Sequence, residues 1–62
     1  MSSEDVWDLL QRNGWELKED GLSPGLATFE NKNIKGDISV PLKKKEMPDS
    51  MLNEIFKKAG LI

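Results

Sequence analysis

The first hydrophobic pattern along the chain is helical. Within residues 3–13, the apolar side chains Val6, Leu9 and Leu10 recur three or four positions apart, which is the spacing of one face of an amphipathic helix. Two serines precede this stripe and either can cap the helix, while the acidic residues of the first turn suit the positive end of the helix dipole. We predict that the helix stops at Asn13-Gly14, because glycine adopts the left-handed conformation that often closes a helix.

Apolar and polar residues alternate in the middle of the chain, which predicts strands. Residues 15–18 alternate in this way, and residues 26–30 and 34–42 are the second and third predicted strands. Two segments rich in turn-forming residues separate these strands, at positions 19–25 and 31–33. The first segment contains the turn signals Asp-Gly and Pro-Gly and the second is rich in asparagine, so both are expected to be turns.

A second helical stripe lies near the end of the sequence. The helix is expected to begin near Pro48 or Asp49, because proline is tolerated in the first helical turn, and to end at Gly60. Its apolar members, spaced as one face of a helix requires, are Leu52, Ile55, Phe56 and Ala59.

These elements give the order α-β-β-β-α in one domain of residues 1–62. Short connections between successive strands favour an antiparallel three-stranded meander. Each helix has to bury its apolar stripe, and the simplest arrangement packs both helices on one face of the sheet. We therefore predict an α+β fold in which Trp15 and Leu17 of the first strand face inward, while Ile38 and Val40 of the third share one face.

Composition narrows the chemistry that this chain can perform. The sequence contains no cysteine and no histidine, which removes disulfides, thiolate metal sites and imidazole acid–base catalysis. We therefore expect no metal and no cofactor. No apolar run approaches the roughly 20 residues of a membrane helix, and the acidic N-terminus lacks the features of a signal peptide, so we expect a soluble, cytoplasmic protein without a membrane partner.

Charge is unevenly distributed along the chain. Residues 1–31 carry seven acidic and two basic side chains, whereas residues 32–62 carry seven lysines and four acidic side chains, so the halves have net charges of −5 and +3. Lys43-Lys44-Lys45, which we expect at the entrance to the second helix, is a candidate phosphate-binding cluster. The plainer interpretation of the same residues is a solvated run of charge.

Four segments of the chain match the pattern of one known family. They are Leu9-Leu10-Gln11-Arg12-Asn13-Gly14-Trp15, the strand with Phe29, Val40-Pro41 before the lysine cluster, and Pro48-Asp49-Ser50-Met51-Leu52-Asn53-Glu54-Ile55-Phe56-Lys57-Lys58-Ala59-Gly60-Leu61. Together they resemble the HicA toxin family of bacterial toxin–antitoxin modules, over nearly the whole chain. The resemblance implies a fold like a double-stranded RNA-binding domain, and the activity of an mRNA interferase, which is a metal-independent endoribonuclease. It also implies a HicB-like antitoxin as protein partner.

The resemblance assigns RNA contact to particular lysines. In that fold a lysine cluster at the start of the last helix contacts phosphates, which here corresponds to Lys43, Lys44 and Lys45. Lys32 and Lys35, near the turn between the second and third strands, are secondary RNA-binding candidates.

The catalytic signature of the family is absent. The family's histidine, counted back from the strand with Phe29, falls near Leu26 or Ala27, and Leu42 stands where members often have a second histidine. An aliphatic side chain is neither a general base nor a general acid, and loss of a general base costs about 10²–10⁴-fold in rate. We therefore expect RNA cleavage by this chain to be weak or absent.

Two further interpretations stay open at this point. The chain is alternatively a small protein-interaction module, which binds a HicB-like partner or itself and has no RNA activity; an exposed Trp7 beside Val6 would favour such a surface. In the other interpretation the nuclease is active through a different group, such as Glu30 if burial raises the pKa of its carboxyl.

Overall fold

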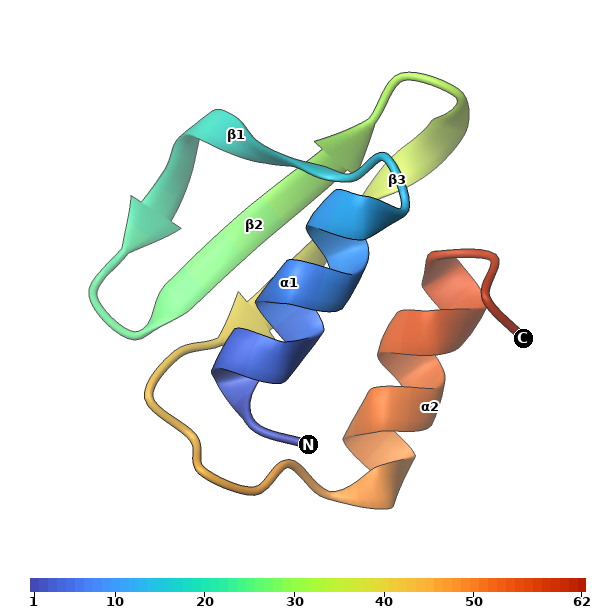
Figure 1. Cartoon of the computed structure of the whole chain (residues 1–62). Coiled ribbons are helices and arrows are strands. Elements are labelled where there is room, and N and C mark those ends of the chain that lie inside the picture. The colour runs from blue at the N-terminus through green and yellow to red at the C-terminus, as the bar shows by residue number, and fades with distance from the viewer.

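The computed structural model describes residues 1–62 and has five elements (Figure 1). They are α1 (Ser3–Arg12), β1 (Glu16–Ser23), β2 (Leu26–Asn31), β3 (Ile34–Pro41) and α2 (Asp49–Lys58). The strands form one antiparallel sheet in the order β1-β2-β3, so neighbours in sequence are also neighbours in the sheet. The predicted α+β class and element order are confirmed.

Both helices bury their apolar stripes against the same face of the sheet. Alternate residues of β2 and β3 point into a single core, and the intervening residues, such as Thr28 and Ser39, lie on the open face, where their hydroxyls are 3.3 Å apart. The buried core consists of Val6, Leu10, Trp15, Ala27, Phe29, Ile38, Val40, Met47, Leu52, Ile55 and Ala59. Because helix and strand residues share this one cluster, the two-layer arrangement follows from the apolar patterns of the sequence.

Local signals set both ends of α1. The hydroxyl of Ser2 accepts a hydrogen bond from the Asp5 N–H at 3.2 Å, and the Asp5 carboxylate accepts one from the Ser2 N–H at 3.0 Å, which completes a capping box. The hydrogen bond that the Asp5 carboxylate accepts from the Ser2 N–H, followed by its interaction with the Ser2 side chain, lowers the pKa of Asp5. The helix closes where Gly14 has φ +87° and the Trp15 N–H donates to the Leu10 carbonyl at 3.0 Å.

The prediction for β1 was wrong in length. We predicted a turn at Glu19–Gly21, but the strand continues through these residues. They do not form a turn because they belong to a large bulge in β1. Leu17 pairs with Phe29 and Leu22 with Ala27, so four residues of β1 face one residue of β2. The chain reverses only at the Pro-Gly pair that follows β1, where a glycine with φ +88° supplies the turn.

β3 and α2 follow the predictions closely. β3 ends at Pro41, one residue before the predicted boundary, and α2 begins at Asp49 as expected. The helical stripe of α2 is buried, except for Phe56, which is half-buried. Met47 is fully buried as well, although it lies in the loop before α2 and outside any periodic stripe.

The ten-residue helices α1 and α2 are too short and too polar to cross a bilayer.

Candidate functional site

The three consecutive lysines lie in the loop between β3 and α2, residues 42–48, which we call the lysine loop. We predicted them before a second helix that begins near Pro48 or Asp49, and α2 does begin at Asp49, with Pro48 as its N-cap. Met47, at the end of the loop, is buried in the core. Hydrogen bonds between Ser3 and Lys44 place the lysines next to the N-terminus of α1.

Ser3 fixes the lysine loop to α1. Its side chain is buried, and its hydroxyl donates a hydrogen bond to the Pro41 carbonyl at 2.6 Å. The same hydroxyl accepts one from the Lys44 N–H at 3.0 Å. The Ser3 N–H in turn donates to the Lys44 carbonyl at 2.9 Å. Three hydrogen bonds at one residue hold the middle of the loop in place.

Two further contacts hold the ends of the lysine loop. At its start, the Leu42 N–H donates to the Gly25 carbonyl at 2.9 Å, which joins the loop to the turn between β1 and β2. At its end, the Met47 N–H donates to the Met1 carbonyl at 2.8 Å, and the amino group of Met1 lies 3.2 Å from the Glu46 carboxylate. The backbone of the loop is therefore anchored along its length.

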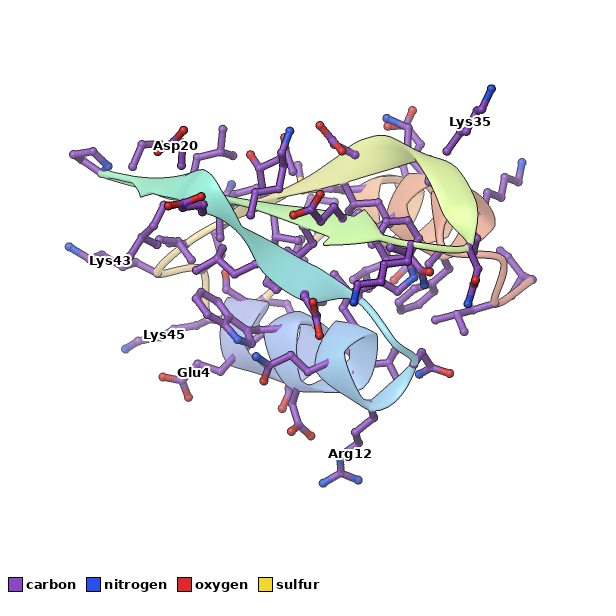
Figure 2. All side chains as sticks on the ribbon, turned by 90° about the horizontal axis from the view of Figure 1, so that it is seen from above. Glu4, Arg12, Asp20, Lys35, Lys43 and Lys45 are labelled. Atoms are coloured by element: carbon purple, nitrogen blue, oxygen red, sulfur yellow. The ribbon has the colours of Figure 1, made fainter.

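The lysine side chains themselves are free. Lys43, Lys44 and Lys45 are all exposed, and none of them takes part in the three ion pairs of the structure. Lys43 has φ +61° and is the only residue other than glycine in the left-handed region, a strain that is often found at functional sites. Figure 2 shows Lys43 and Lys45 extending outward on the same side of the molecule.

A cleft of about 720 Å³ separates the lysine loop from α1. Its apolar surface comes from Trp7 of α1 and Leu42 of the loop. Trp7 is half-buried, and its ring meets the Phe29 ring edge to face, with centroids 5.2 Å apart and an interplanar angle of 88°. The residues that line the cleft are Ser2, Ser3, Glu4, Trp7, Asp8, Gln11, Leu42, Lys43, Lys44 and Lys45.

The wall of the cleft on α1 is acidic and the opposite wall is basic. Glu4 is exposed and takes part in no ion pair, whereas Asp8 pairs with Arg12 at 3.0 Å. The Gln11 amide, also exposed, makes no hydrogen bond within the protein. The cleft thus offers three ammonium groups on one side and a free carboxylate and amide on the other.

Lys32 and Lys35 lie at the opposite end of the sheet. Lys35 and Pro41 belong to the same extended strand and are six residues apart, which corresponds to about 20 Å. Figure 2 shows Lys35 and Lys43 at opposite ends of the molecule. The structure therefore does not bring these two secondary candidates into one site with the lysine loop.

The positions at which the resemblance predicts the histidines of the HicA family are close together but chemically inert. Leu26 pairs with Pro41 in the sheet and is 39% exposed, whereas Ala27 is completely buried in the core. Leu42 follows Pro41 directly and is half-buried. Glu30, the alternative base, is exposed, so the burial that this hypothesis requires is absent.

Sequence reasoning missed the α1 side of the site. Glu4, Trp7, Asp8 and Gln11 recur three or four positions apart and form a second stripe on the helix, beside the core stripe. This spacing was the feature of the sequence from which the second stripe could have been predicted. Val6 is completely buried, so the exposed Trp7–Val6 surface that would favour an interaction module is not formed.

No protein-family model matches this chain, and no curated protein is significantly similar to it.

Proposed function

We propose that this protein is a HicA-like RNA-binding domain of the mRNA interferase type that contacts phosphates through the lysine loop and cleaves RNA weakly or not at all. The observation that carries the proposal is the set of three exposed, unpaired lysines on a loop anchored by Ser3. The resemblance of the sequence to the HicA family supports the choice of RNA as ligand.

Anchoring of the loop backbone favours binding energetically. Lysine side chains lose rotamer freedom when they bind a phosphate. A loop that is already fixed at Lys44 and Met47 adds little further ordering cost. The three ammonium groups also need not break an existing ion pair before they bind, because none of them has one.

Weak cleavage follows from the side chains around the lysine loop. The groups that line the cleft are carboxylates, lysines, hydroxyls, an amide and apolar side chains. None of these groups is an imidazole, the side chain that most often serves as general acid or base near neutral pH. We therefore propose RNA binding with at most slow cleavage.

Salt dependence tests the proposal. If three lysines neutralise three phosphates, affinity for RNA should fall about 20- to 40-fold when salt rises from about 50 to 200 mM. Binding to a labelled single strand and a labelled duplex, followed by gel electrophoresis of the RNA, measures affinity and cleavage together. Absence of binding at low salt would refute the proposal.

A charge-matched control separates the lysine loop from general attraction. The variant with Lys43→Gln, Lys44→Gln and Lys45→Gln should lose most of the affinity and the salt dependence. The control variant with Lys32→Gln, Lys35→Gln and Lys57→Gln removes the same charge from other parts of the surface and should bind nearly as well as the wild type. Equal losses in the two variants would contradict a specific role of the loop.

A protein-interaction module is the second candidate, and the acidic surface around the β1 bulge favours it. A shallow hollow there is lined by Glu19, Asp20 and Glu30. Its only lysine, Lys18, is already paired with Asp37 at 2.8 Å. This surface suits a basic segment of a HicB-like partner or of a second copy. Sedimentation of the protein alone, and with such a partner, tests this candidate.

A further inference from the structure

We infer that the cleft between α1 and the lysine loop binds one unpaired nucleotide of an RNA strand, with the base against Trp7 and the phosphate on the lysines. The inference rests on the proposed function and extends it, because it selects unpaired bases as the ligand and assigns a base-binding site. It uses residues of α1 that phosphate binding alone does not require.

The size and lining of the cleft fit a nucleotide. Small-molecule sites usually have volumes of about 300–1,000 Å³, and this cleft, which is open to solvent, has a volume of about 720 Å³. Its apolar surface, from Trp7 and Leu42, lies directly beside the three lysines. A nucleotide likewise has an apolar part beside a charged part, because its flat, weakly polar base is joined through a sugar to a phosphate.

Trp7 is half-buried, and its edge-to-face contact with the buried Phe29 restricts the orientation of its ring. A base that packs against a fixed aromatic ring loses less entropy than one that must first order a mobile side chain. Stacking of a base on an aromatic side chain changes affinity about 5- to 150-fold per base. In a duplex the bases are already stacked and paired, so only a single strand can use this contact.

The acidic wall of the cleft favours bases with an exocyclic amino group. Glu4 has no cation partner and lies across the cleft from the lysines. A carboxylate accepts hydrogen bonds from an amino group such as the N4 amino group of cytosine. Uracil has a carbonyl at that position and would be repelled by the same carboxylate. We therefore expect cytosine to be preferred over uracil.

Three ribo-oligomers of equal length and charge test the inference. Fluorescently labelled C6, U6 and an abasic hexamer are titrated with the protein at low salt. C6 should bind about 2- to 12-fold more tightly than U6, which is the effect of one hydrogen bond. Both should bind at least about fivefold more tightly than the abasic hexamer. Nuclear magnetic resonance should show the indole N–H signal of Trp7 moving on addition of C6, while that of the buried Trp15 stays in place.

Two variants at exposed positions and one conservative change of the half-buried Trp7 limit the effect of the test on folding. Glu4→Ala should remove the preference for C6 over U6, whereas Glu54→Ala, the same change on α2 outside the cleft, should leave it intact. Trp7→Phe keeps an aromatic contact with Phe29 and should reduce the advantage of both hexamers over the abasic one.

The outcomes separate this inference from the proposed function. Equal, salt-sensitive binding of all three hexamers would overturn the base site and leave phosphate binding by the lysines in place. A preference for C6 that survives in Glu4→Ala would overturn the role of that carboxylate. Absence of binding by every hexamer would overturn both the base site and the proposed function.

Discussion

Replacement of Ser3 by alanine should destabilise this protein more than any other serine substitution. The Ser3 side chain is 3% exposed and joins two segments that are 38 and 41 residues away in sequence. Alanine fits the same space, but it leaves the Pro41 carbonyl and the Lys44 N–H without their hydroxyl partner. The backbone hydrogen bond from Ser3 to Lys44 is kept, so the variant removes only the contribution of the side chain.

The size of the effect follows from these two hydrogen bonds. Each is worth about 0.5–1.5 kcal/mol, and a partner left buried and unsatisfied costs about 1–3 kcal/mol. The loop can open partly to water, so we expect a loss of about 2–3 kcal/mol. A 62-residue domain has about 3–9 kcal/mol of stability in total. The melting temperature should therefore fall by about 10–20 °C.

Urea unfolding, followed by tryptophan fluorescence, measures the loss. Two serine controls calibrate it. Ser2→Ala removes the N-cap of α1 and should cost about 1 kcal/mol. Ser50→Ala changes an exposed position in α2 and should be nearly neutral. In Ser3→Ala the amide of Lys44 should also exchange with solvent faster. A loss no larger than that of Ser2→Ala would refute the argument that Ser3 anchors the loop.

Two further predictions concern the sheet. Gly21→Ala should cost about 3 kcal/mol, because a Cβ at this position would lie 2.4 Å from the backbone carbonyl oxygen of Thr28. The control Gly36→Ala, where no atom lies within 4 Å of the new Cβ, should cost only about 1 kcal/mol of backbone strain. Urea unfolding measures both losses, and the reverse order would contradict this reasoning. The hydrogen bond to Asp37, followed by the coulombic attraction of the same group, raises the pKa of Lys18. The stability that this pair contributes should therefore be constant from neutral pH up to the usual lysine pKa of 10.5, and be lost as pH rises through the raised pKa. The difference in unfolding free energy between wild type and Lys18→Met should shrink over this alkaline range, and a difference that grows would contradict the assignment.

Elements with local signals were predictable from the sequence. The helices were recognisable from the periodic apolar positions and from the glycines that close them, because these signals act within one or two turns. The face of the sheet that is buried was predictable in the same way, from Ile38 and Val40 on one face of β3. The choice of Ser2 rather than Ser3 as the N-cap was not predictable from the sequence, because either of two adjacent serines can cap a helix until the fold buries one of them.

The errors arose where two structures share one local signal. Asp20-Gly21 suits a tight turn, but it also suits a bulge, and only pairing of Leu22 with Ala27 decides between them. Burial of Met47 was not predictable either, because this residue lies in a loop and outside any periodic stripe. The cleft was not predictable, because its two walls are far apart in sequence and are joined by hydrogen bonds that only the folded chain makes, chiefly those of Ser3.

The bulges have a consequence for how this sheet meets other chains. β1 and β3 are its two edges, and each has an irregular register, near Gly21 in β1 and near Gly36 in β3, while β2 lies between them. An edge strand with regular geometry is a template on which strands of other molecules can pair and aggregate. Here regular pairing along either edge is interrupted after a few residues, and a lysine stands beside each interruption, at Lys18 and Lys35. The bulge that makes β1 longer than predicted, together with the irregularity in β3, therefore opposes the growth of the sheet into fibrils.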